Sequence, residues 1–226
     1  MRWNWDRIAA AMGIVFAALF IAAYIVLGDS PKLGDSAEEI ATYYTDNRGQ
    51  VVTAGILFGL ATIAALWFVA AIATMLRNAG EIRLGATVLA SGAAMVGIAL
   101  MVLSFNAGQV FGVAATDPDA SATLNSLAWA CQVIVSWPVA GLALATAVGA
   151  WRAGIFPQWL AYASIAGAIV LALGGTTWAT DGFWAPDGAF SLITVIVFLL
   201  WAIVTSWIFM QRVATAEAPR PATAAV

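Results

Sequence analysis

Six long runs of apolar residues, none carrying a charge, constrain the fold of this chain more than any other feature. They cover residues 8–27, 51–76, 84–105, 124–150, 159–178 and 190–210. A helix needs about 20 mostly apolar residues to cross the hydrocarbon core of a membrane. The runs lack the alternation of apolar and polar residues that is typical of a barrel strand. The pattern predicts an all-α fold, a polytopic membrane protein with a six-transmembrane-helix bundle.

The composition of the chain agrees with a membrane environment and removes several functional classes. Of the 226 residues, 63% are hydrophobic, 9% are charged and none is His. Without imidazole, a His-ligated haem, a His-containing zinc site and His-dependent nucleophilic catalysis are all excluded. The net charge of −3 argues against a nucleic-acid partner. The only cysteine, Cys131, lies in an apolar run, where a thiol behaves as a small hydrophobic group. We therefore expect neither an enzyme nor a bound cofactor or metal.

The distribution of basic residues predicts the orientation in the membrane. One side holds Arg2, Arg7, Arg77, Arg83, Arg152, Arg212 and Arg220, whereas the other holds only Lys32 and Arg48. Cytoplasmic loops of membrane proteins carry an excess of Lys and Arg. We therefore expect a multi-pass protein of the plasma or inner membrane with both termini in the cytoplasm. The first run exceeds the length of a signal-peptide core, so a retained helix is expected.

Two domains of very different character are expected along the chain. Residues 1–212 form the transmembrane domain, and residues 213–226 form a disordered cytoplasmic tail. The tail combines small residues with Pro219 and Pro221, and such a segment cannot bury enough apolar surface to order itself.

The first outer loop contains the pattern of a short amphipathic helix. Ser36 and Glu39 have the spacing of a capping box. Behind them, an apolar stripe is formed by Ala37, Ile40, Ala41 and Tyr44. One interpretation makes this helix the contact for a partner, with Glu38, Glu39, Tyr43 and Tyr44 as contact residues. The alternative is a helix that only covers the mouth of the bundle.

Polar side chains within the apolar runs are the candidates for ligand binding, because each needs a partner that lipid does not supply. They are Gln132 and Ser136 in the fourth run, Asn106 and Gln109 after the third, and Thr176 and Thr177 in the fifth. One hypothesis is an outward-open vestibule for a neutral or lipid-like molecule. The alternative is that they join helix to helix, each bond contributing about 0.6–2 kcal/mol.

Small residues at a spacing of four point to close helix packing. Gly55 and Gly59 form a GxxxG pattern, and Gly141, Ala145 and Gly149 extend the same spacing over two turns. Such patterns let two backbones approach each other, either within one chain or between chains of a homo-oligomer. Both alternatives stay open at this point.

The acidic residues of the outer loops allow two interpretations. Asp117, Asp119, Asp181 and Asp187 come from two loops without a basic residue. Converging carboxylates would bind a divalent cation. The simpler interpretation makes Asp117 part of a turn before the fourth helix and Asp187 a cap for the sixth.

The chain resembles the small multi-pass membrane proteins of unknown function found in high-GC bacteria. The resemblance rests on the layout of residues 28–31, 36–48 and 152–159. It implies no activity, since these families have none assigned. The first functional hypothesis is a non-enzymatic scaffold or accessory subunit of a membrane complex. The second is a small carrier or binding protein for a neutral or lipid-like molecule. The expected partners are membrane lipid and another membrane protein chain or a second copy.

Overall fold

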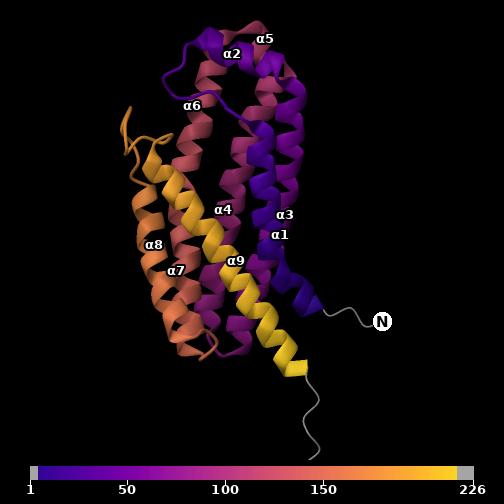
Figure 1. Cartoon of the computed structure of the whole chain (residues 1–226), viewed down its shortest axis with the longest axis vertical. Coiled ribbons are helices and arrows are strands. Elements are labelled where there is room, and N and C mark those ends of the chain that lie inside the picture. The colour runs from indigo at the N-terminus through magenta and orange to yellow at the C-terminus, as the bar shows by residue number, and fades with distance from the viewer. Residues whose placement is uncertain (1–4, 218–226) are drawn as a thin grey trace, which may run out of the picture.

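The protein is an all-α bundle, as the apolar runs predict (Figure 1). The computed structural model describes residues 5–217, and within this range the regular elements are helices alone. The longer ones are α1 (Trp5–Leu27), α3 (Arg48–Asn78), α4 (Ile82–Gly108), α6 (Pro118–Ile134), α7 (Ser136–Arg152), α8 (Gln158–Gly174) and α9 (Ala189–Glu217). The short ones are α2 (Ala37–Asp46), the π-helix η1 (Gln109–Val113) and α5 (Ala114–Thr116).

Five stretches of the described chain are long and apolar enough to cross a membrane. They are Arg7–Leu27, Arg48–Asn78, Ile82–Thr116, Pro118–Arg152 and Ala189–Arg212. The run at residues 159–178 instead folds into α8, which has 17 residues and ends at Gly174. The hydroxyls of Thr176 and Thr177 donate to the carbonyls of Leu173 and Gly174, which closes the helix early. A sixth membrane span therefore stays a prediction.

The helix of the fourth run is interrupted at Val135, between α6 and α7. Pro138 lies three residues further on, and a proline removes one backbone donor and pushes against the carbonyl four residues before it. The π-helix η1 adds a second irregularity, where Gly112 takes φ +135°, a backbone conformation that favours glycine.

The long helices form a closed ring around one core. In order of contact the ring runs α1, α3, α4, α7, α8 and α9, and α9 returns to α1. The large side chains Ile72, Leu76 and Leu142 are fully buried inside it. Figure 1 shows that α9 slants across the bundle, so that its C-terminal part lies away from α8.

The two ends of the bundle differ in what covers them (Figure 1). The described ends of the chain lie at one end, together with the connections at residues 79–81 and 153–157. The opposite end is covered by α2 and α5. This arrangement agrees with the sides assigned from the basic residues, although which side faces the cytoplasm stays a prediction.

The C-terminal helix reaches further than the sequence predicts. The expected tail begins at residue 213, but α9 continues to Glu217. Ala214 and Ala216 lie in this extension. Alanine has the highest helix propensity, which favours the additional turn. Residues 218–226 of the expected tail lie outside the described residues.

Candidate functional site

Helix α2, which lies over one end of the bundle, begins with a capping box, as predicted. The backbone N–H of Ser36 donates to Glu39 Oε2 at 3.0 Å, and the Glu39 N–H donates to Ser36 Oγ at 3.3 Å. These bonds from Ser36 favour the charged carboxylate and hold the pKa of Glu39 below its usual value. Ile40, Ala41 and Tyr44 are buried in a small second core beneath α2. The helix therefore covers this end of the bundle.

The capping box has a measurable dependence on pH. Because the folded-state pKa of Glu39 is lowered, its contribution to stability is present above about pH 4.5, the ordinary pKa, and is lost as the pH falls through the lowered value. We expect amide hydrogen exchange at the start of α2 to accelerate, relative to the intrinsic rate, below that pH. In Ser36→Ala this acid-dependent change should disappear, whereas Thr53→Ala, an exposed position on α3, should retain it. An identical pH profile in Ser36→Ala and the wild type would contradict the assignment.

The tyrosines proposed for partner contact face inward. Tyr44 is only 5% exposed and its hydroxyl donates to Asn106 Oδ1 at 2.9 Å. Burial, with a smaller effect of the neighbouring Tyr43, raises the pKa of Tyr44 well above its usual value. The Tyr43 hydroxyl donates to the carbonyl of Leu27 at 2.8 Å. Of the four proposed contact residues, only Glu38 and Glu39 are exposed. A contact between Tyr44 and a partner chain would require α2 to move away from the bundle.

Gln109 and Ser121 form a reciprocal buried pair between η1 and α6. Gln109 is 2% exposed, and its Nε2 donates to the Ser121 carbonyl at 2.8 Å. The Ser121 hydroxyl donates back to Gln109 Oε1 at 2.7 Å. The amide that sequence reasoning assigned to a ligand is thus paired within the chain. Nothing in the sequence pattern had marked Ser121.

The remaining candidates for the vestibule make contacts of their own within the protein. Gln132 on α6 accepts a long hydrogen bond of 3.5 Å from the Tyr24 hydroxyl on α1. Ser136 on α7 lies where α8 ends, since a Cβ on Gly174 would be 3.1 Å from Ser136 Oγ. Thr177 is buried at the same junction and bonds within its own turn. Ser136 and the end of α8 are brought together. A vestibule lined by all six residues stays a prediction.

The connection between α1 and α2 crosses α6, which the sequence did not indicate. Trp129 Nε1 donates to the carbonyl of Pro31 at 3.1 Å, and Asn125 Nδ2 donates to the carbonyl of Lys32 at 3.3 Å. The two donors are four residues apart on one face of α6. They hold the connection against the helix and help to position α2 over the bundle.

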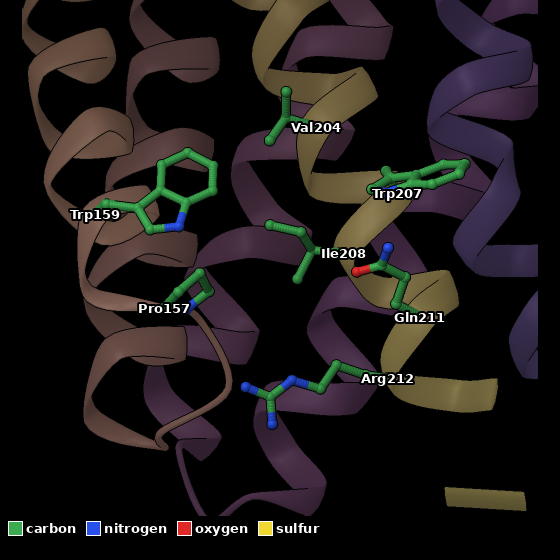
Figure 2. A pocket seen from close by; sticks show the side chains of 7 residues that line it. All are labelled: Pro157, Trp159, Val204, Trp207, Ile208, Gln211 and Arg212. Atoms are coloured by element: carbon green, nitrogen blue, oxygen red, sulfur yellow. The ribbon is translucent and has the colours of Figure 1, made fainter. Parts of the chain in front are cut away.

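Two hollows lie on the side of the bundle rather than at its mouth. The α1–α3 groove has a volume of about 340 Å³ and is lined by Trp5, Ile8, Met12, Val15, Leu19, Leu60, Ile63, Ala64 and Trp67. The α8–α9 groove has a volume of about 620 Å³ and is lined by Pro157, Trp159, Val204, Trp207, Ile208, Gln211 and Arg212 (Figure 2). The first is wholly apolar, whereas the second has a polar end.

The outer aspartates do not assemble into a metal site within residues 5–217. No group of three or more His, Cys, Asp or Glu residues is placed to hold a metal ion among the described residues. Asp117 instead caps α6, because its Oδ1 accepts from the N–H of Ala120 at 3.0 Å. This is the simpler of the two interpretations given by the sequence.

Comparison with known protein families, with curated proteins and with solved structures gives no match to this chain. The resemblance to small multi-pass membrane proteins therefore stays an expectation. The class that the fold supports is an all-α protein with several helices able to cross a membrane. Its function has to be inferred from its own surfaces.

Proposed function

We propose that this chain is a non-enzymatic scaffold or accessory subunit of a membrane complex, which binds a transmembrane helix of a second chain along α3. The observation that carries the proposal is the position of the GxxxG pattern. A Cβ on Gly55 or Gly59 would meet no atom of the described chain within 4 Å. By contrast, a Cβ on Gly149 would lie 2.9 Å from Leu76 and one on Gly141 would lie 3.0 Å from Ser91. The pattern of Gly141, Ala145 and Gly149 thus serves packing within the chain, and the pattern of Gly55 and Gly59 does not.

The outward glycines belong to a continuous apolar face of α3. Val52, Ile56, Gly59, Ile63 and Trp67 follow one another at spacings of three and four residues, which places them on one side of the helix. Ile56 is 60% exposed and Ile63 is 55% exposed. On this face the glycines carry no side chain, and branched side chains lie beside them. The backbone of another helix can approach closely at such glycines.

The α1–α3 groove adjoins this face, because Ile63 and Trp67 also line the groove. At one end of the groove the Trp5 and Trp67 rings are stacked, with their centroids 5.9 Å apart. In a membrane, helix association depends on close packing rather than on the hydrophobic effect. A groove next to outward glycines provides that packing for a helix from another chain.

The carrier hypothesis has less support from the contacts. Asn106, Gln109, Thr176 and Thr177 each use their side chain in a hydrogen bond within the protein. A neutral ligand at those positions would have to replace these bonds. The carrier therefore remains the alternative, and binding of a small molecule that requires Gln132 and Ser136 would favour it.

The test is native mass spectrometry of the protein extracted from its own membrane with its lipids. We expect a stoichiometric second chain, either another copy or a different protein. Gly55→Leu combined with Gly59→Leu should weaken its retention about tenfold or more, since overpacking costs about 1–3 kcal/mol. The matched control is Gly97→Leu on α4, whose Cβ would also meet no described atom within 4 Å.

Two outcomes would overturn the proposal. One is a wild-type protein that carries no second chain. The other is full retention of that chain by the Gly55 and Gly59 variant. A partner lost instead on Glu38→Lys would move the contact to α2, where this exposed carboxylate lies outside the capping box.

A further inference from the structure

We propose that the α8–α9 groove binds one anionic phospholipid, with its phosphate headgroup at Arg212 and its acyl chains against Val204 and Ile208. This inference is independent of the contact proposed on α3, because no residue is shared between the two surfaces. It assigns a lipid to a site that the sequence patterns did not mark.

The groove exists because α9 slants relative to α8. The two helices meet at the C-terminal end of α8, where a Cβ on Gly174 would lie 2.7 Å from Thr194 Cγ2. They are still joined halfway along by the Trp201 indole, which donates to Ser164 Oγ at 3.1 Å. Beyond this bond α9 diverges from α8 (Figure 1). The lining residues Pro157 and Arg212 place the groove where α8 begins and α9 approaches its end. A lipid would fill the wedge that the slant leaves.

The polarity of the lining changes along the groove in the way a phospholipid requires. Val204 and Ile208 form its apolar wall, and Gln211 and Arg212 follow one turn further along α9. Trp159 lies opposite on α8, and Figure 2 shows its ring and the Arg212 guanidinium reaching into the space between the two helices. Tryptophan prefers the headgroup level of a membrane, so its position here agrees with a lipid border.

The charge at the polar end is suited to an anion. None of the seven described lining residues carries a carboxylate, and Arg212 contributes a positive charge. The start of α8 lies beside it, since Pro157 and Trp159 also line the groove. No described side chain caps the N-terminus of α8 at Pro157. The first N–H groups of a helix carry partial positive charge, which favours an anion nearby.

The predicted orientation selects the lipid class. The groove lies where α8 begins and α9 approaches its end. Arg77, Arg83 and Arg152 lie at the ends of α3, α4 and α7 that the basic-residue bias assigns to the cytoplasm. The cytoplasmic leaflet is the one that displays anionic headgroups to such residues. The occupant is therefore a membrane phospholipid with net negative charge and not a free phosphate ion.

The experiment measures lipid retention by the full chain in micelles that contain equal amounts of phosphatidylglycerol and phosphatidylcholine, with native mass spectrometry as the readout. We expect the wild type to retain one phosphatidylglycerol in preference to phosphatidylcholine. Arg212→Gln should reduce this preference about fivefold, the effect of one cationic side chain near an anionic surface. Arg212→Lys keeps the charge and should restore most of it. Arg83→Gln, at the same end but outside the groove, is the matched control and should leave the preference unchanged.

A further variant keeps the test independent of the charge. Val204→Trp fills the apolar part of the groove and should lower retention even if Arg212→Gln proves unstable. The proposal is overturned if the wild type shows no preference for phosphatidylglycerol. It is equally overturned if Arg83→Gln lowers the preference as much as Arg212→Gln, or if Val204→Trp retains the lipid fully.

Discussion

Gly92→Ala is expected to destabilise the bundle by about 1–3 kcal/mol, the usual cost of overpacking a tight helix contact. A Cβ at this position would lie 2.3 Å from Val69 Cγ1 and 2.7 Å from Val69 Cγ2. Val69 is itself buried and branched, so it cannot turn away without moving into another neighbour. Relief therefore requires α3 and α4 to separate. The measurement is the free energy of unfolding in a titration with sodium dodecyl sulfate.

The control for this substitution lies on the same helix. Gly97→Ala introduces the same methyl group where no described atom lies within 4 Å. It reports the gain in helix propensity alone, which is up to about 1 kcal/mol and stabilising. The difference between the two variants is the cost of the contact. Equal free energies of unfolding for the two variants would show that α3 and α4 are not packed at Gly92.

The second large effect is expected at the buried pair of Gln109 and Ser121. Gln109→Leu leaves the Ser121 hydroxyl and carbonyl without the partner seen at 2.7 and 2.8 Å. An unpaired buried polar group costs about 1–3 kcal/mol, so the free energy of unfolding should fall by this amount. Ser121→Ala should cost less, because it removes only the hydroxyl.

A double-mutant cycle separates the pair from general loss of packing. The double variant should lose less stability than the two single variants together, because each single change leaves a group that the other removes. Ser126→Ala on the same helix is the control. Its hydroxyl bonds to the Ala122 carbonyl of its own helix and it is exposed, so its effect should stay within about 0.5 kcal/mol. Strict additivity would mean that the Gln109 and Ser121 side chains do not act as a pair.

The features predicted correctly from the sequence depend on local chemistry. The capping box at Ser36 and Glu39 needs only residues three apart, and it is present with both of its bonds. The all-α fold follows from the apolar runs, because a backbone in lipid has to satisfy its own hydrogen bonds.

The features that the sequence left open depend on which way a helix faces once its neighbours are present. Gly55 and Gly149 belong to similar patterns, yet one faces outward and the other packs against Leu76. Spacing gives the relative direction of two residues on a helix but not the direction of the core. For Tyr44 the sequence allowed either a partner contact or a helix that covers the bundle, and the structure buries this side chain.

The candidate ligand residues show a further limit of sequence reasoning. A polar residue in an apolar run indicates that a partner is needed, but the partner of Gln109 is reached only through the unusual turn at η1. No local pattern marks a π-helix before the chain is folded. The lipid-facing grooves are equally invisible in the sequence, since each is formed by helices distant along the chain or by the slant of one helix.

The closed ring of helices has a consequence for biogenesis. Synthesis proceeds from α1, but the neighbour that completes the ring on its far side is α9, whose Ser206 hydroxyl donates to the carbonyl of Ala10. Until α9 is synthesised, the side of α1 that packs against it in the folded protein has no partner from this chain. We therefore expect the bundle to close only after translation of α9.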